Sequence, residues 1–270
     1  MPSTHPFLLP ARSLRWLILL LLAALLAGVV LSAWRTRDAP PHAGELVVTD
    51  PTTTAPHVLR LATMNIRRGR GMDERTDLSR TALTLRGGDV IGLQEVGHGQ
   101  AEELGSRLRL AALFAPTERR WFRDDFGNAL LSRYPASWQS IPLPRSSGQP
   151  ARNVVLAHMR IGNTTLRVLV AHLGRHEDNA PQLARLGELF CSLETPAVLM
   201  GDLNAHAGAP QLESIRSMPG VVDVLRGRVA DDSRRVTWMF VRGLTVKDAW
   251  LSDDGASDHP ALFAEFEPPR

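Results

Sequence analysis

Eight consecutive residues, Gly201-Asp202-Leu203-Asn204-Ala205-His206-Ala207-Gly208, are the most informative part of this chain. They follow Thr195-Pro196-Ala197-Val198-Leu199-Met200, a short apolar run after a proline, which predicts a buried strand ending at Gly201. Asp202 and Asn204 alternate with Leu203, so a carboxylate and an amide leave the strand end on one side while Leu203 turns into the core. An ordinary Asx turn is the alternative, because Asp, Asn and Gly are common turn formers.

Length and composition predict one large domain. The chain has 270 residues, of which 44% are hydrophobic, and that is enough for a sizeable core. The formal net charge is +3, too small to indicate a general nucleic-acid-binding surface, although a local cluster could still attract an anion. Cys191 is the only cysteine, which excludes an intramolecular disulfide and any multi-cysteine metal site.

The N-terminal region contains an uncharged apolar segment from Trp16 to Trp34, with arginines on both sides. As a helix it would cover roughly 28 Å, close to the ~30 Å hydrocarbon core of a bilayer. We therefore expect a short tail at 1–13 and a transmembrane anchor at 14–34, with the protein a single-pass membrane protein and its remainder extracytoplasmic. A cleaved signal peptide is the alternative, but Leu31 is too large for a good small-x-small site before a cut after Ala33.

Residues 35–57 are rich in proline and threonine and have no useful periodicity, so they predict a linker. The catalytic domain is then expected at 58–270. Apolar periodicity predicts helices at 77–86, 100–109 and 180–193. It predicts strands at 58–66, 89–96, 126–135, 152–161, 164–172, 236–241, 244–250 and 261–266, with a hairpin turn at Gly162-Asn163.

Seven polar side chains fall at the expected strand ends, separated by segments that alternate between strands and helices. Such a pattern predicts two sheets whose ends converge on one site. Each residue alone has an ordinary explanation as a solvated or core side chain, but the seven together are much harder to explain that way. They are Asn65, Glu95, His172, Asp202, Asn204, Asp258 and His259.

Six ordered motifs resemble those of the endonuclease/exonuclease/phosphatase superfamily, which includes deoxyribonuclease I-like nucleases, neutral sphingomyelinases and inositol-phosphate phosphatases. The resemblance covers essentially all of residues 58–267. It implies an α/β fold, a four-layer α/β sandwich of two mixed sheets flanked by helices, and magnesium-dependent hydrolysis of a phosphoester. The motifs are Met64-Asn65-Ile66, Leu93-Gln94-Glu95-Val96, Gly127-Asn128-Ala129-Leu130-Leu131-Ser132-Arg133-Tyr134-Pro135, Ala171-His172-Leu173, Gly201-Asp202-Leu203-Asn204 and Ser257-Asp258-His259-Pro260.

The residue types suit a hard cation. Mg²⁺, with Mn²⁺ as a substitute, prefers oxygen ligands and keeps several waters, so one or two carboxylates with an amide suffice to hold it. Glu95 is the expected first ligand with Asn65 beside it, and Asp258 could join them or hold its neighbours. A metal and hydrogen-bond donors offset the negative charge that develops on a phosphoryl group under attack.

The same reasoning assigns catalytic roles to four residues. Asp202 is expected to orient and deprotonate the attacking water, and Asn204 and His259 to donate hydrogen bonds to the phosphoryl oxygens. His172 would bind phosphate or protonate the leaving oxygen. The expected substrate-binding residues are Asn128, Arg67 and Arg68.

One stretch departs from the family pattern. A late strand of the superfamily carries an Ile-Asp-Tyr-like motif whose aspartate orients the catalytic histidine, whereas this chain has Arg235-Val236-Thr237-Trp238-Met239-Phe240. Thr237 in place of the acid predicts a less well oriented His259, unless an unmatched residue such as Asp231 or Asp232 supports it. A non-catalytic phosphate- or lipid-binding domain of the same fold is therefore the alternative function.

We expect an anionic substrate. Arginine clusters suit phosphates, and Arg119, Arg120 and Arg123 alternate with aromatic Trp121 and Phe122, which could stack on bases or enter a lipid headgroup region. The expected anchor favours a phospholipid or sphingolipid headgroup, with extracellular nucleic acid as the second choice. We infer no obligate protein partner.

Overall fold

The computed structural model describes residues 11–33, 37–49, 56–119, 125–229 and 233–268. Helix α1 (Ala11–Ala33) belongs to a separate unit of the chain, and within it the side chains of Arg15, Trp16 and residues 18–30 are described. In these described ranges, no helix has both the length and the apolar character needed to cross a membrane. The described residues therefore do not support the transmembrane helix predicted at 14–34.

The rest of the described chain forms two mixed seven-stranded sheets. One sheet, here sheet A, has the order β1 (Arg37–Asp38), β5 (Ala111–Arg119), β6 (Phe126–Ser132), β4 (Val90–Gly97), β3 (Leu59–Asn65), β14 (Ala261–Phe266) and β13 (Val246–Ser252). The other, sheet B, has the order β11 (Val221–Asp223), β12 (Thr237–Arg242), β10 (Ala197–Asp202), β9 (Thr164–His172), β8 (Asn153–Ile161), β7 (Ala136–Pro142) and β2 (Ala43–Leu46). β3 and β4 pair in parallel, as do β9 and β10.

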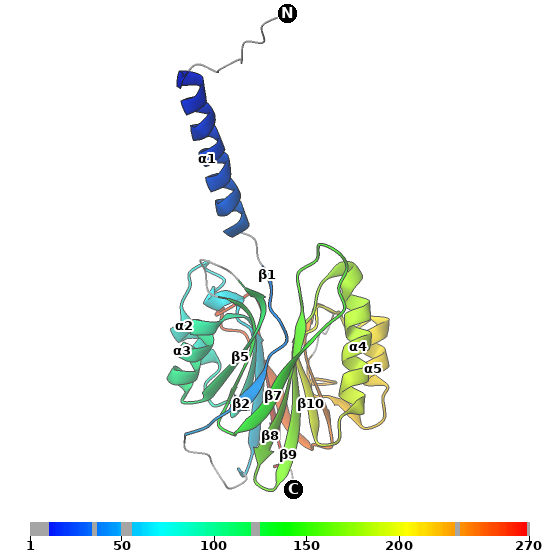
Figure 1. The fold of residues 1–270 in the computed structure, drawn as a ribbon. Helices are drawn as coiled ribbons and strands as arrows, with labels where there is room; N and C mark the ends of the chain where they lie inside the picture. The colour runs from blue at the N-terminus through cyan, green and yellow to red at the C-terminus, as the bar shows by residue number, and fades with distance from the viewer. Residues whose placement is uncertain (1–10, 34–36, 50–55, 120–124, 230–232, 269–270) are drawn as a thin grey trace, which may run out of the picture. The chain divides into compact units, whose positions relative to one another are not determined.

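Helices cover the outer faces of both sheets (Figure 1). α2 (Leu78–Thr84) and α3 (His98–Leu108) lie on sheet A, and α4 (Asn179–Ser192) and α5 (Pro210–Arg216) lie on sheet B. The predicted architecture of two mixed sheets flanked by helices is therefore confirmed. Two short 3₁₀ segments, Arg67–Gly69 and His176–Asp178, lie in loops beside these layers.

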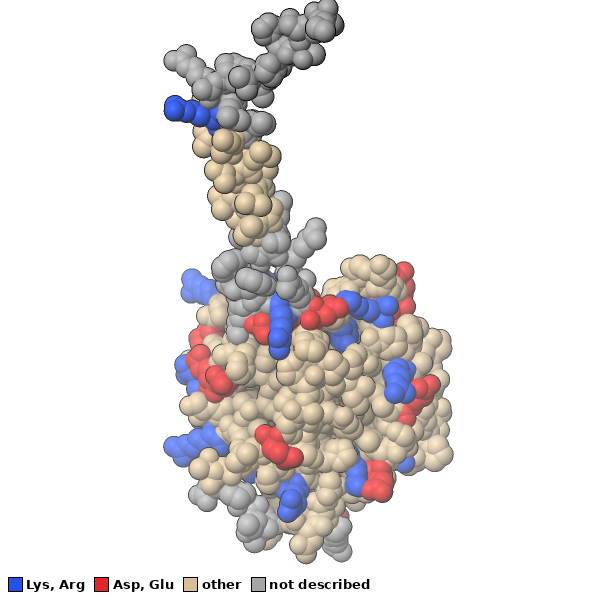
Figure 2. All heavy atoms as spheres, in the orientation of Figure 1, with Lys and Arg blue, Asp and Glu red and all other residues tan. Residues whose placement is uncertain are grey.

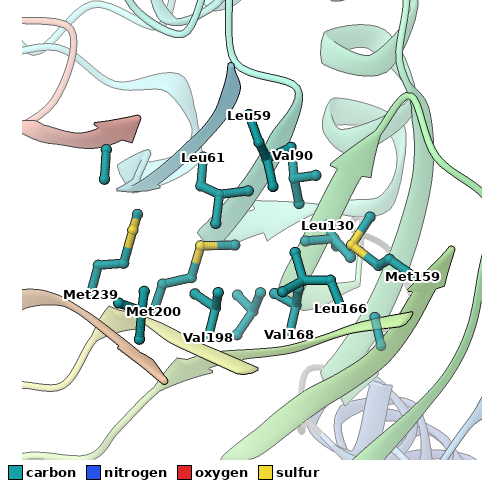
Figure 3. Close-up of a cluster of buried hydrophobic side chains, with 14 of the residues drawn as sticks. Leu59, Leu61, Val90, Leu130, Met159, Leu166, Val168, Val198, Met200 and Met239 are labelled. Atoms are coloured by element: carbon teal, nitrogen blue, oxygen red, sulfur yellow. The ribbon is translucent and has the colours of Figure 1, made fainter. Parts of the chain in front are cut away.

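Three apolar clusters hold the layers together. The first fills the space between the sheets, where Leu61 and Val90 of sheet A face Val198 and Met200 of sheet B (Figure 3). The second lies between sheet B and its helices and the third between sheet A and its helices. Burial of these side chains removes apolar surface from water, which is the main force that joins the sheets.

The predicted elements mostly match the structure. The hairpin is confirmed: Ile161 pairs with Thr164, and Gly162 has φ 57°, which suits a residue without a side chain. Asp77 caps α2 by accepting a hydrogen bond from the Ser79 backbone N–H (2.8 Å). β5, β7, β11 (Val221–Asp223) and α5 were missed, because a proline interrupts β5, polar residues interrupt β7, and β11 and α5 are too short for a clear apolar period.

The predicted linker at 35–57 is wrong in part. β2 pairs with β7 at the edge of sheet B, and Leu46 at its end is buried in the core between the sheets. Asp38 also forms an ion pair with Arg145. An edge strand is held by backbone hydrogen bonds and needs few apolar side chains, so its sequence has little strand signal. Residues 50–55 of the linker lie outside the described residues.

Charged side chains of both signs are interspersed over the face of the sandwich shown in Figure 2. This distribution agrees with the small net charge of +3. Strong attraction for a polyanion is therefore not a property of this face as a whole, and any anion site must be local.

Candidate active site

Two carboxylates, one from each sheet, meet at a single amide. Asn65, the last residue of β3, donates through Nδ2 to Asp202 Oδ2 (2.9 Å) and to Glu95 Oε1 (3.1 Å). Asp202 is completely buried at the end of β10, whereas the Glu95 side chain keeps 29% of its exposure. The ends of β3 and β10, one from each sheet, therefore meet at this amide, and Glu95 of β4 joins them.

Glu95 was predicted to lie at the end of its strand, but β4 continues to Gly97. The pairing of β4 with β6 shifts its register between Leu93 and Val96, and Glu95 has a positive φ of 54°. A bulge of this kind inserts an unpaired residue and redirects its side chain, here toward Asn65. The left-handed backbone of a glutamate is costly, and such strain concentrates at functional sites.

His172, the last residue of β9, lies between the carboxylates and an arginine. Its Nε2 is 3.5 Å from Asp202 Oδ2 and 4.0 Å from Glu95 Oε1, and its Nδ1 is 2.9 Å from Arg152 Nη1. An arginine guanidinium has donors and no acceptor, so Nδ1 must be the acceptor in this contact. The proton of the neutral ring is then on Nε2, which faces the carboxylates.

Burial, together with the positive charge of Arg152, lowers the pKa of His172 from 6.5 to about 3, against the opposing effect of Asp202. The ring is therefore neutral at neutral pH. Of the two predicted roles, protonation of the leaving oxygen would need the charged ring, which this low pKa disfavours. Binding a phosphoryl oxygen through the Nε2–H remains available.

Sequence reasoning missed Arg152. Burial lowers the pKa of its guanidinium, and the charges of Glu95 and Asp202 oppose that effect. The hairpin contained the information needed to find it. From the turn, the register of β8 and β9 pairs Val154 with Ala171, and this places Arg152 beside the end of β9. The expected register of β8 and β9 could therefore have identified the neighbour of His172.

The loop before β14 brings His259 to the same place. Its Nε2 is 3.8 Å from Asp202 Oδ2, and its side chain is 12% exposed. Ser257 fixes this loop to β3, since its hydroxyl donates to the Asn65 backbone oxygen (2.8 Å). Asp258 lies further out: its side chain is 44% exposed, and its Oδ2 is 3.7 Å from Arg67 Nε.

Asn204 is held firmly in the loop after β10. Its backbone N–H donates to Asp202 Oδ1 (3.1 Å), its Nδ2 donates to the Leu173 backbone oxygen (2.8 Å), and its Oδ1 accepts from Arg175 Nε (3.1 Å). Its φ of 46° is a left-handed conformation that asparagine tolerates. One N–H of the amide is thus already used inside the protein. Arg175, which is exposed, is a second residue that sequence reasoning missed.

The three predicted substrate-binding residues have different environments. Arg67 pairs with Glu74 (2.9 Å) and lies near Asp258, at the rim of the site. The Arg68 guanidinium lies 4.7 Å from the centre of the Phe126 ring. Asn128 is buried in β6, and its Nδ2 donates to Asn153 Oδ1 (3.0 Å). Asn128 thus spends its donor on a buried amide pair, which argues against direct substrate binding.

The predicted arginine and aromatic cluster at 119–123 lies mostly outside the described residues, which resume at Asp125. Asp231 and Asp232, the suggested supports for His259, also lie outside them. Thr237 is described: it pairs with Asp202 across β10 and β12 and is 2% exposed. Its hydroxyl has no hydrogen-bond partner among the described residues.

A metal would find oxygen donors here. Within the described part of the chain, no group of three His, Cys, Asp or Glu side chains has the arrangement of a metal site. Glu95 and Asp202 nevertheless both accept from the Asn65 amide and lie beside a neutral histidine, with the positive charges of Arg152 and Arg175 near that ring. Carboxylate and amide oxygens with room for waters suit Mg²⁺ or Mn²⁺ rather than a soft metal. The donor set therefore fits the expected cation.

The sequence matches the model of the endonuclease/exonuclease/phosphatase family over residues 62–259. The chain belongs to this family. It is also 31% identical over 93 residues to a UPF0294 protein of Klebsiella pneumoniae (strain 342). That match covers 32% of this chain, and the chain spans about a third (35%) of the curated relative.

Solved structures share the fold. An endonuclease/exonuclease/phosphatase of Beutenbergia cavernae aligns with a TM-score of 0.64 at 22% identity, over 79% of this chain and 72% of its own. Humanized TDP2 of D. rerio aligns with a TM-score of 0.58 at 20% identity, over 78% and 99%. The mannosyl-6-phosphatase of Bacteroides thetaiotaomicron aligns with a TM-score of 0.60 at 16% identity, over 77% and 99%.

Proposed function

We propose that this protein is a divalent-cation-dependent phosphoesterase that hydrolyses a phosphodiester, in a lipid headgroup or a nucleic acid, by attack of water. The observation that carries the proposal is the meeting of Asp202, Glu95 and Asn65 with His172 and His259 where strand ends of two sheets converge. Catalysis of phosphoryl transfer consists largely of positioning and of offsetting negative charge, and this cluster supplies groups for both.

Asp202 is placed to act as the general base. It is completely buried, and its two oxygens are fixed by Asn65 Nδ2 (2.9 Å) and by the Asn204 backbone N–H (3.1 Å). A carboxylate held in this way can orient a water and accept its proton as the nucleophile attacks phosphorus.

Two histidines flank the base. His172 donates a hydrogen bond from Nε2 toward the phosphoryl oxygens, and His259, whose Nε2 approaches the same Asp202 oxygen, does the same. Glu95 and Asn65 would hold the cation, with Asp258 close enough along the loop to contribute. When bound, the cation would supply charge that offsets the negative charge developing on the phosphoryl group. Arg67 and Arg68 at the rim would attract the anionic substrate.

The direct test is a substrate panel with the full-length protein, Mg²⁺ and detergent. The panel contains single-stranded and duplex DNA, sphingomyelin, phosphatidylinositol and soluble phosphate monoesters, the last because one structural neighbour is named a phosphatase. We expect turnover of a diester that is lost in Asp202→Asn and kept in Asp248→Asn, a matched change at an exposed acid on β13. No turnover of any member, with binding retained, would favour the non-catalytic binding domain instead.

Attachment to a membrane is a separate part of the proposal, and the sequence alone supports it, through the uncharged run from Trp16 to Trp34. It favours a lipid substrate and an extracytoplasmic domain. Full-length protein with an N-terminal tag should stay in the membrane fraction after alkaline carbonate washing. A shortened, soluble form without the tag would identify the segment as a signal peptide.

A further inference from the structure

A cavity away from the candidate active site is lined by arginines. Its volume is about 450 Å³, and four of its lining residues are Arg86, Arg107, Arg109 and Arg133. A fifth, Arg60, borders it by donating through Nη1 to the Gly87 backbone oxygen (3.4 Å). Among the described residues, the lining includes no acidic side chain.

The cavity lies at the opposite end of sheet A from the carboxylates. Its Gly87-Gly88 turn leads into β4 at Val90, and Glu95 follows five residues later, which is about 17 Å along a strand. Its Arg109 ends α3, whose 11 residues cover about 16 Å from the Gly97 end. A ligand in this cavity could therefore not touch the catalytic groups.

Three of the five arginines are compensated by acids outside the cavity, and two are not. The compensated pairs are Arg60 with Glu265, Arg107 with Glu103 (2.7 Å) and Arg133 with Asp89 (2.8 Å). In the described part of the chain, the guanidinium groups of Arg86 and Arg109 form no ion pair and no hydrogen bond. The cavity thus has two positive charges without a counter-ion.

Two features of the backbone place these two arginines together. Arg86 follows α2, and Arg109 closes α3 in a left-handed conformation, φ 57°, with its N–H donating to the Ser106 oxygen (3.2 Å). An arginine at a helix C-terminus also interacts favourably with the helix dipole, which would explain each residue separately. The helix dipole does not explain why both arginines line one cavity whose described lining has no acidic side chain.

We propose that this cavity binds the phosphate group of a phosphate monoester. Such a group carries a charge of about −1.5 to −2 at pH 7, which balances the two uncompensated arginines. The planar guanidinium donors of Arg86 and Arg109 suit bidentate contacts to phosphate oxygens. This second site is independent of the reaction proposed above and would persist in a protein that catalyses nothing.

The test compares two double variants of the full-length protein with the same change in charge. Arg86→Ala/Arg109→Ala removes the uncompensated pair, and Arg160→Ala/Arg234→Ala removes two arginines that line no part of the cavity and likewise have no ion pair among the described residues. Inorganic phosphate is titrated by calorimetry and by NMR of the Gly87 and Gly88 amides. A second arm uses phosphatidylcholine vesicles with and without phosphatidic acid.

We expect a phosphate site at the glycine turn that weakens at least ten-fold in Arg86→Ala/Arg109→Ala and is unchanged in Arg160→Ala/Arg234→Ala, with hydrolysis equal in both. The same difference on phosphatidic acid vesicles would identify a lipid headgroup as the source, and its absence a soluble phosphate ester. Equal phosphate binding by both variants would overturn the proposal. Lower thermal stability of Arg86→Ala/Arg109→Ala without a change in binding would assign the arginines to the helix ends instead.

Discussion

Arg152 Nη1 lies 2.9 Å from His172 Nδ1, so a positive charge faces that ring nitrogen. Because arginine only donates, this contact fixes the neutral ring with its proton on Nε2. That nitrogen is 3.5 Å from Asp202 Oδ2. The relationship favours His172 as a hydrogen-bond donor at the site.

Replacing Arg152 should therefore reduce activity through His172. Arg152→Met keeps much of the side-chain volume but removes the donor, so the proton can move to Nδ1 and the Nε2–H is lost. We expect kcat to fall by a factor of about 10 to 100, with a smaller change in KM. ¹⁵N NMR of the histidine ring should show the Nε2–H form in the wild type and a mixture in the variant.

Arg160→Met is the matched control, since Arg160 lies on β8 with its side chain exposed. If Arg152→Met leaves both the ring tautomer and kcat unchanged, then Arg152 does not position His172.

The buried histidine should also make the folded state sensitive to acid. Its pKa is about 3 in the folded protein and about 6.5 when unfolded, so between these values the unfolded chain binds the extra proton. The contribution of the neutral ring to the free energy of unfolding is fully present above pH 6.5. It is lost as the pH falls toward 3, which lowers the free energy of unfolding by on the order of 4 kcal/mol. Urea unfolding at several pH values measures this loss, which should be smaller in His172→Gln. An equal acid sensitivity of the variant would assign the effect to other groups.

The sequence predicted the parts of the site that depend on a single segment. The apolar run before Gly201 indicated the strand, and Asp202 is its last residue. Glu95 was placed at a strand end, because a bulge depends on the register with β6 and not on the residues of β4 alone. Asn128 matched a motif, yet its side chain is buried on Asn153, a contact that only the packing of the two sheets creates.

Arg152 shows a second reason why part of the site could not be predicted from the sequence. It lies in none of the six motifs, and its importance arises from the neighbour that the hairpin register brings to it. The edge strand β2 was missed for a similar reason, since backbone pairing with β7 defines it and its own four residues do not.

Tyr134 provides a test of the core that leaves the site intact. Its hydroxyl is buried without a hydrogen-bond partner among the described residues, and burial raises its pKa to about 12. The unfolded chain loses this proton near pH 10, so the folded state should lose stability as the pH rises from about 10 to 12. Tyr134→Phe should stabilise the protein by up to about 1 kcal/mol at pH 7 and reduce the alkaline loss. Thermal unfolding at pH 7 and 10.5 measures both, and a clear destabilisation would show that the hydroxyl has a partner.

Divalent cations should stabilise the folded protein as well as support activity. Glu95 and Asp202 place two carboxylates on one amide, and a bound cation would offset their repulsion. Mg²⁺ or Mn²⁺ should raise the Tm of the wild type, by an amount that increases with concentration, and should leave the Tm of Glu95→Gln nearly unchanged. Excess chelator should remove both the shift in Tm and the activity. Full turnover in chelator would contradict a cation-dependent mechanism.

Thr237 offers the sharpest test of how His259 is oriented. Thr237 pairs with Asp202 across β10 and β12, it is 2% exposed, and its hydroxyl has no partner among the described residues, so an acid introduced here would lie directly across from Asp202. Thr237→Asp should lower the Tm, because a second buried carboxylate beside Asp202 is repelled by it. It should also raise kcat several-fold at pH 7 to 8, because the family places an acid on this strand to orient the catalytic histidine. Thr237→Asn, which matches its size without the charge, should lower the Tm less and leave kcat unchanged. A folded Thr237→Asp protein with reduced kcat would show that His259 already has its support and that this strand does not limit the reaction.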